Sequence, residues 1–289
     1  VLWGCAVGSA FGGICLDAYG RKRVLIIASF IMVSSSIWSS LAPSSFHLIL
    51  ARLMGGIGCG ILTGACPLFI SEVSPETHRG RMVTLYHFAV CLGIVLCVFV
   101  NWAVYLLASA YQDANRFYEP GLEFIMTQNW RVMLASESIP GLIFLACTFF
   151  LPESPRWLIK QKRIDLAQQV LARISGPKKA AAVASEILAA VKLERHLSFF
   201  SLFSGKLRRP LLITIWLCVF SEACGISAIL YYGPQLFEQS GLSLGSSLGG
   251  FSIIAIVNLI FNLVAMQYLD SIGRKRLLAI GSSGAMVSL

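Results

Sequence analysis

The sequence predicts an all-α membrane protein, because its composition, its long apolar runs and the placement of its basic residues agree. Hydrophobic residues make up 56% of the 289 positions and charged residues 13%, whereas soluble domains average about 45–50% and about 25%. The mean hydropathy is +0.75. A soluble core of this length could not bury so much apolar surface. These values exclude a disordered chain, a collagen-like chain and an ordinary cytosolic enzyme.

Eight apolar runs are the predicted membrane spans, since about 20 apolar residues cover the hydrocarbon core. They are residues 1–16, 24–42, 46–70, 82–108, 130–151, 210–232, 246–269 and 277–289. The first and last runs are short, the chain starts at Val1 and it stops inside a run at Leu289. We therefore expect an internal piece of a longer protein.

The basic residues predict the orientation of the spans. Most of the 23 Lys and Arg residues follow the first, third and seventh spans or lie in the stretch 153–209. The loop 109–129 on the opposite side holds more acidic than basic residues. Because cytoplasmic loops are enriched in Lys and Arg, the basic loops are predicted to be cytoplasmic. The net charge of +9 then reflects topology and not a nucleic-acid partner.

The 9 cysteines form no CxxC pair and are predicted to be small buried hydrophobes, with no metal site.

The stretch 153–209 is the one sizeable segment predicted to lie outside the membrane. Apolar residues recur at helical spacing from Ile164 to Ile174, Gly176-Pro177 interrupts the pattern, and a second pattern runs from about 180 to 196. We expect short amphipathic helices, acting as a linker or in gating. The predicted domains are an N-terminal transmembrane bundle (1–152), this cytoplasmic helical linker (153–209) and a truncated C-terminal bundle (210–289).

A seven-residue pattern, D-x-x-G-R-K-R, occurs at 17–23 and again at 270–276. Both copies lie between apolar runs and are predicted on the same side of the membrane. An even number of spans must therefore separate the two copies. This spacing predicts two six-helix halves related by a parallel repeat. The glycine permits a tight turn, and the aspartate can pair with the arginine or accept bonds from a helix N-terminus. Such a cluster can form in one conformation and break in another, which would bias a gate; a plain positive anchor is the alternative.

The two D-x-x-G-R-K loops resemble the loop signature of the major facilitator superfamily. Further motifs resemble its sugar porter family: R-x-x-x-G-x-G at 52–58, PLFISEVSP at 67–75, NWR at 129–131, PESPRWL at 152–158, and GISA at 225–228 before Tyr231-Tyr232. The resemblance covers essentially the whole chain. It implies the major facilitator fold, with helices 2–9 of 12 present and two six-helix halves joined by a cytoplasmic helical segment.

The resemblance also implies a sugar site built from uncharged polar side chains, which match hydroxyls without burying a charge. The matching positions are His87, Ser221, Glu222, Ser227 and Asn258, with Tyr231 and Tyr232 as an outer aromatic gate. Several depart from the family's amides, since His87 stands for a Gln, Ser221-Glu222 for Gln-Gln, and Ser227 for an Asn. A site with His and Glu predicts a solute other than glucose, which could be another sugar, a polyol or a weakly cationic solute. Alternatively, Glu222 or His87 carries a proton. Ordinary helix packing is the alternative for each polar residue, although an intramembrane Glu usually faces a cavity or a partner.

A cytoplasmic ion-pair network that holds the inner gate closed is the second expectation from the resemblance. Its predicted members are Asp17, Gly20, Arg21, Lys22, Glu72, Arg79, Glu153, Arg156, Asp270, Gly273, Arg274 and Lys275. Arg52 lies within a span and is predicted to find a polar partner, which the sequence does not name. For Glu137, a structural ion pair with Arg131 and a functional role are both open.

The predicted function is transport of a sugar or polyol by alternating access, as a facilitator or a proton symporter. A transporter-like sugar sensor and a non-functional truncated transporter are the alternatives. No covalent chemistry is expected, because H-E-x-x-H and Walker motifs are absent from the sequence. The expected partners are the sugar or polyol, protons in the case of symport, and the lipid bilayer, with no cofactor and no metal. The plasma membrane is the expected location.

Overall fold

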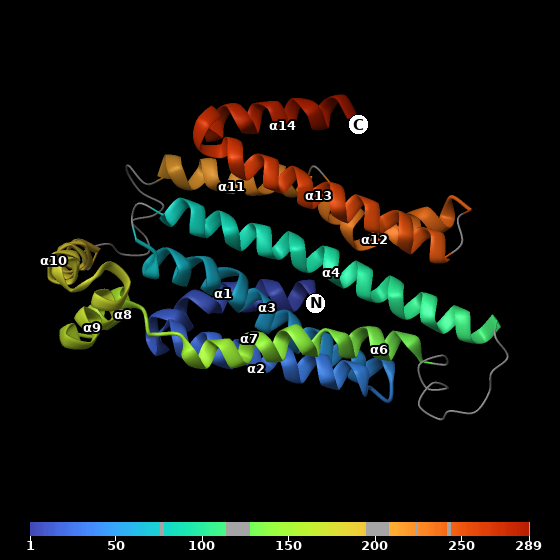
Figure 1. The fold of residues 1–289 in the computed structure, drawn as a ribbon, viewed down its shortest axis with the longest axis horizontal. Coiled ribbons are helices and arrows are strands. Elements are labelled where there is room, and N and C mark those ends of the chain that lie inside the picture. Colours follow the sequence, from blue (N-terminus) through green and yellow to red (C-terminus); the bar gives the residue numbers. More distant parts are fainter. Residues whose placement is uncertain (76–77, 114–127, 195–207, 224, 242–243, 289) are drawn as a thin grey trace. The chain divides into compact units, whose positions relative to one another are not determined.

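The computed structural model describes residues 1–75, 78–113, 128–194, 208–223, 225–241 and 244–288, and the regular elements of this part are all helices (Figure 1). The helices are α1 (Leu2–Tyr19), α2 (Arg21–Ser40), α3 (Ser45–Val73), α4 (Arg79–Asp113), α6 (Asn129–Ser136), α7 (Ser138–Phe150), α8 (Pro155–Lys160), α9 (Ile164–Ser175), α10 (Pro177–Glu194), α11 (Arg208–Ala223), α12 (Ile226–Gln239), α13 (Leu244–Ile272) and α14 (Arg274–Ser288). The predicted all-α fold class is confirmed for these residues.

The chain divides into two compact units, and each is described by itself. The first unit holds Val1–His87 and Val100–Val191, and the second holds Phe88–Phe99 and Lys192–Leu289. The central part of α4 therefore belongs with the C-terminal helices. The division into 1–152, 153–209 and 210–289 stays a prediction.

In the first unit, α2 and α3 are the packing centre. α1 lies so close to α3 that a Cβ at Gly4 would be 2.9 Å from the Cα of Gly56. Small residues allow this approach, as the four-residue glycine spacing predicts. On α2, the Ser35 hydroxyl donates to the Ala51 carbonyl of α3 at 2.6 Å. The Ser36 hydroxyl donates to the Leu134 carbonyl of α6 at 2.9 Å.

Five helical stretches in the described part are long and apolar enough to cross a membrane. They are Arg21–Ser40, Ser45–Val73, Arg79–Ala110, Asn129–Phe150 and Ser247–Tyr268. The other predicted spans correspond to α1, α11, α12 and α14. These helices are not among those that are long and apolar enough to cross a membrane. At 16, 14 and 15 residues, α11, α12 and α14 are each shorter than the roughly 20 residues that span the hydrocarbon core.

The predicted continuous span 210–232 is wrong in one respect, because the structure breaks it into α11 and α12. Gly225 has a φ of +80° and precedes the first residue of α12. A left-handed residue cannot continue a right-handed helix, so the chain changes course here. The second unit then packs α12 on α13, where Gly233 lies against the Phe251 ring. Its core contains Val95, Val98, Phe251 and Ala255.

Helices α8, α9 and α10 form a small bundle with its own apolar core at one end of the first unit (Figure 1). Its buried residues are Trp157, Leu158, Ile159, Ala167, Leu171, Ala180 and Ala184. α9 begins at Ile164, as its periodicity predicts, and the interruption at Gly176 is confirmed by a φ of +83°. α10 begins at Pro177, slightly before the expected start near 180. Proline is favoured in the first turn of a helix, because its missing N–H has no intrahelical partner there.

Candidate functional site

Arg21, the first residue of α2, and Glu72, near the end of α3, form a two-pronged ion pair. Arg21 Nε lies 2.9 Å from Glu72 Oε2, and Arg21 Nη2 lies 2.9 Å from Glu72 Oε1. Their side chains are 7% and 4% exposed. Paired charge-assisted bonds of this kind fix both position and orientation. Because both charges are buried, removing one partner leaves the other uncompensated.

Asp17 extends this pair toward α8. Arg21 Nη1 donates to Asp17 Oδ1 at 3.2 Å and to the Leu16 carbonyl at 3.1 Å. The second carboxylate oxygen of Asp17 lies 3.3 Å from Lys160 Nζ, at the last residue of α8. Asp17 is 56% exposed and Lys160 48%, so this outer contact contributes far less than the buried pair. The predicted pairing of the loop aspartate with its arginine is confirmed.

Ser154 joins α8 to the same glutamate. Its hydroxyl donates to Glu72 Oε2 at 2.6 Å and accepts the Trp157 backbone N–H at 3.3 Å. The second bond makes Ser154 the N-cap of α8, with Pro155 as the first helical residue. Trp157 Nε1 donates to the Asp17 carbonyl at 3.1 Å. Ser154, Trp157 and Lys160 were not among the predicted site residues, although the serine-proline pair in PESPRW signals a capped helix start.

Glu153 and Gly20 complete the contact between the α1–α2 turn and the linker. Glu153 Oε1 accepts the backbone N–H of Lys22 at 3.0 Å and that of Ser154 at 3.0 Å. Lys22 lies in the first turn of α2, so Glu153 and not Asp17 is the carboxylate that binds this helix N-terminus. Gly20 has a φ of +92°, and a Cβ there would lie 2.7 Å from Glu153 Oε2. Glycine suits the conformation of this turn, and an added Cβ would displace the Glu153 carboxylate.

We call Asp17, Arg21, Glu72, Glu153, Ser154 and Lys160 the charged network. The Lys22 ammonium lies beside it and donates to the Phe149 carbonyl at 2.8 Å. Arg156 is half-buried on α8. Arg79 is exposed at the first residue of α4 and supplies none of the network contacts above.

The second copy of the loop lies between α13 and α14. Gly273 has a φ of +87°, close to the +92° at Gly20, so both turns hold a glycine at positive φ. Lys275 is exposed. The side chains of Asp270 and Arg274 lie outside what the structure describes, so their predicted ion pairs stay predictions.

The predicted sugar-binding residues lie in both units. His87 is exposed on α4 in the first unit, 5.5 Å from the Tyr86 ring between centroids. In the second unit, Ser227 Oγ donates to Glu222 Oε2 at 2.7 Å, across the break between α11 and α12. Tyr231 and Tyr232 are exposed on α12, Asn258 is half-buried on α13, and the Ser221 side chain lies outside the described residues. The structure thus brings Glu222 and Ser227 together.

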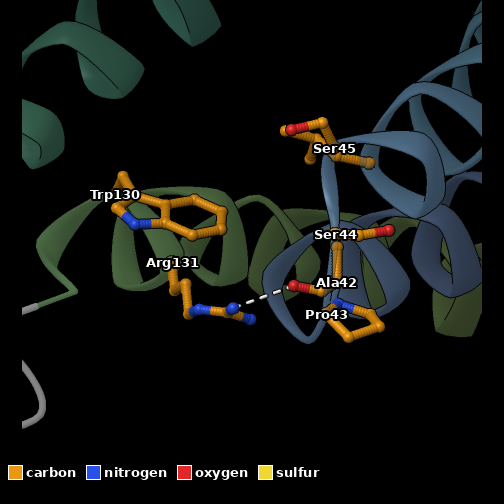
Figure 2. Close-up of a pocket in the computed structure, with 7 residues that line it drawn as sticks. Ala42, Pro43, Ser44, Ser45, Trp130 and Arg131 are labelled. Atoms are coloured by element: carbon orange, nitrogen blue, oxygen red, sulfur yellow. Dashed lines mark hydrogen bonds between the residues drawn. The ribbon is translucent and has the colours of Figure 1, made fainter.

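Arg52 and Glu137 form an ion pair at 3.0 Å, which names the partner that the sequence left open. For Glu137, the sequence left open an ion pair with Arg131 or a functional role, and the structure pairs Glu137 with Arg52 and not with Arg131. Arg131 instead donates to the Ser40 and Ala42 carbonyls, each at 2.8 Å, and so binds the C-terminal end of α2. Arg131 lies at a hollow of about 320 Å³, and Figure 2 shows this residue among those that line it. The hollow is lined by Ala42, Pro43, Ser44, Ser45, Leu48, Trp130 and Arg131.

A family model described as "Sugar (and other) transporter" matches residues 1–289. The chain belongs to this family. Among curated sugar transporter relatives, it is 34% identical to the arabinose-proton symporter of Bacillus subtilis, covering 98% of this chain and 58% of that protein. It is 32% identical to the D-xylose-proton symporter of Escherichia coli, covering 100% of this chain and 60% of that protein. The chain therefore spans less than two thirds of these relatives.

Solved structures of the Escherichia coli xylose transporter XylE share the fold. A partially occluded inward-open form has a TM-score of 0.77 at 29% identity, covering 96% of this chain and 62% of that one. A complex with 6-bromo-6-deoxy-D-glucose has a TM-score of 0.80 and covers 59% of that chain. The prediction that the chain forms part of a major facilitator fold is confirmed.

Proposed function

We propose that the protein containing this chain moves a sugar or polyol across a membrane by alternating access. The observation that carries the proposal is the buried Arg21–Glu72 pair. Ser154, the N-cap of α8, connects this pair to the bundle of α8, α9 and α10 by a hydrogen bond to Glu72. Burying two charges is costly unless each is fully bonded, so this pair is stable only while α2, α3 and α8 stay together. An arrangement that is stable when assembled and costly when half broken suits a two-state gate.

The two halves are proposed to use the loop in the same way. In the first unit the α1–α2 turn is bound by Glu72 and Glu153, and Ser154 donates to Glu72. The turn at Gly273 also holds a glycine at positive φ and has the same D-x-x-G-R-K-R sequence. We infer that Asp270, Arg274 and Lys275 make equivalent contacts, with Arg79 and Arg156 as further cytoplasmic cations. Release of both sets would open the inner side.

The proposed substrate is a monosaccharide or polyol, because the relatives named above are symporters of arabinose and xylose. Its proposed contacts are His87, Ser221, Glu222, Ser227 and Asn258, with Tyr231 and Tyr232 as the outer gate. The Ser227–Glu222 bond orients a carboxylate at a helix break, which would also suit a weakly cationic sugar. We propose proton symport in the plasma membrane and no covalent chemistry.

Uptake by the full-length protein in liposomes tests the proposal. Radiolabelled xylose, arabinose, galactose and inositol would be offered with and without an inward proton gradient and a protonophore. Saturable uptake of at least one solute is expected, and collapse by the protonophore would support symport. Saturable binding without uptake would favour a sensor. If none of the four solutes is bound or taken up, the proposed function is overturned.

A further inference from the structure

The corner between α8 and α9 carries three exposed cations within four positions, Lys160, Lys162 and Arg163. It follows the apolar helix α7, which ends at Phe150, after a short connection and the six-residue α8. Phe150 is 89% exposed, as expected for a side chain that faces lipid. The corner is therefore close in sequence to the membrane end of α7.

Lys162 has a φ of +62°, and among the described residues it is the one non-glycine residue with a positive φ. Its N–H bonds to the Ile159 carbonyl at 2.9 Å, and the Arg163 N–H bonds to the Leu158 carbonyl at 2.9 Å. This pair of bonds is the helix-ending motif in which glycine normally takes the left-handed position. A lysine there has a conformational cost that glycine avoids, which points to a use for its side chain.

Two large apolar side chains follow the cations at the start of α9. Ile164 is 41% exposed and Leu166 is 46% exposed, while Ala167 and Leu171 of the same helix fill the bundle core. Exposed apolar residues beside a basic cluster are typical of segments that lie in the membrane interface. A site for a soluble phosphate compound would have no use for Ile164 and Leu166, so these residues favour a lipid.

We propose that the corner 160–166 binds the headgroup of an anionic phospholipid in the cytoplasmic leaflet. Lys162 and Arg163 donate to the phosphate, and Ile164 and Leu166 rest at the boundary between headgroups and acyl chains. The exposed Asp165 offsets one of the three cations. Clusters of cations next to a membrane span attract anionic lipid in this way.

Lys160 connects this lipid site to the charged network. It lies 3.3 Å from Asp17 Oδ2, and Asp17 also binds Arg21. A headgroup phosphate at the corner offers Lys160 a second acceptor and competes with the Asp17 carboxylate. Anionic lipid would therefore weaken the bond that holds the end of α8 to the end of α1.

Phosphatidylglycerol binding to the full-length protein in neutral detergent, measured by native mass spectrometry, tests the site. Lys162→Gly/Arg163→Gln removes two cations and leaves Lys160 in place, and glycine suits the φ at 162, so folding should be retained. We expect about 25-fold weaker binding, since each such cation contributes roughly five-fold. The matched control is Lys178→Gln/Lys179→Gln, which removes two exposed cations of α10 and should change binding less than two-fold.

Equal weakening by the two double variants would overturn the proposal, because it would show a diffuse attraction. Unchanged binding in Lys162→Gly/Arg163→Gln would overturn it as well. Glycerol 1-phosphate at millimolar concentration should not displace the lipid, and displacement would assign the site to a soluble phosphate compound.

A carboxylate variant tests the competition for Lys160. Asp17→Asn should tighten phosphatidylglycerol binding about five-fold, as one cation is released to the lipid. Glu186→Gln removes an exposed carboxylate of α10 and should leave the affinity within two-fold. Equal affinities of Asp17→Asn and wild type would show that Lys160 is not shared. Each readout is lipid binding, so these results stand or fall separately from sugar transport.

Discussion

The Ser154 hydroxyl lies 2.6 Å from the Glu72 carboxylate, and Ser154 has no exposed surface. The same oxygen accepts the Trp157 N–H and caps α8. The Ser154 side chain therefore fixes both the start of α8 and the position of the Glu72 carboxylate, which pairs with Arg21. This joins α8 to the Arg21–Glu72 pair through a direct bond and not through the chain connection alone.

Ser154→Ala should destabilise the protein by about 2.5–4 kcal/mol, since losing an N-cap costs about 1 kcal/mol and a bond to a charged group about 1.5–3 kcal/mol. The thermal midpoint of the full-length protein in detergent would measure the loss. Ser185→Ala is the matched control, because the Ser185 hydroxyl is exposed and donates to the Ala182 carbonyl of its own helix at 2.7 Å. Equal midpoints for the two variants would contradict the bridging role of Ser154.

Arg21→Ala should slow transport more than it weakens substrate binding, because it leaves the buried Glu72 carboxylate without its cation. Breaking one side of a buried pair costs about 3–5 kcal/mol, and the assembled state of the gate bears that loss. Turnover and substrate affinity would be measured in liposomes. Arg23→Ala, at an exposed position of the same turn, should match wild type. A variant Arg21→Ala with unchanged turnover would exclude a gating role for the pair.

Arg21→Lys refines the same test. Lysine keeps the charge but cannot make the two-pronged contact with both Glu72 oxygens. We expect a loss in thermal midpoint between those of wild type and Arg21→Ala. If Arg21→Lys equals wild type, then charge alone, and not the paired geometry, stabilises the turn.

Gly20→Ala should destabilise the protein more than Gly176→Ala does. Both glycines have a positive φ, +92° and +83°, so both variants incur a conformational cost of about 1–2 kcal/mol. Only at Gly20 would the added Cβ also press on Glu153 Oε2 at 2.7 Å, whereas a Cβ at Gly176 meets nothing within 4 Å. The thermal midpoints of the two variants would separate the cost of the backbone conformation from the cost of the contact with Glu153. Equal losses would mean that Glu153 moves aside freely.

Local pattern was sufficient for much of the fold. The apolar period from Ile164 onward predicts α9, and the D-x-x-G-R sequence predicts both the turn at Gly20 and the bond from Arg21 to Asp17. These features depend on neighbours within one or two helical turns. The break at Gly225 was missed because a single glycine inside an apolar run is compatible with a continuous helix.

Contacts between distant segments could not be read from the sequence. Ser154 and Glu72 are 82 positions apart, and Arg52 and Glu137 are 85 apart. Periodicity assigns a face to each helix but does not say which neighbour that face meets. Arg131 is an instructive case, because its closeness to Glu137 in sequence left an ion pair open, whereas the carbonyls at the end of α2 bind it instead.

Glu222→Gln is expected to retain substrate binding, because the amide oxygen can still accept the Ser227 hydroxyl, which now lies 2.7 Å from the carboxylate. What changes is the charge at the break between α11 and α12. If Glu222 lies in the sugar site, the variant should favour neutral sugars over amino sugars by about ten-fold relative to wild type, the size of one charge-assisted bond of about 1.5 kcal/mol. Competition of glucosamine and glucose against labelled substrate would measure the ratio. Ser227→Ala is the control that removes the bond and keeps the charge. Identical affinity, selectivity and pH profile in Glu222→Gln and wild type would place Glu222 outside the site.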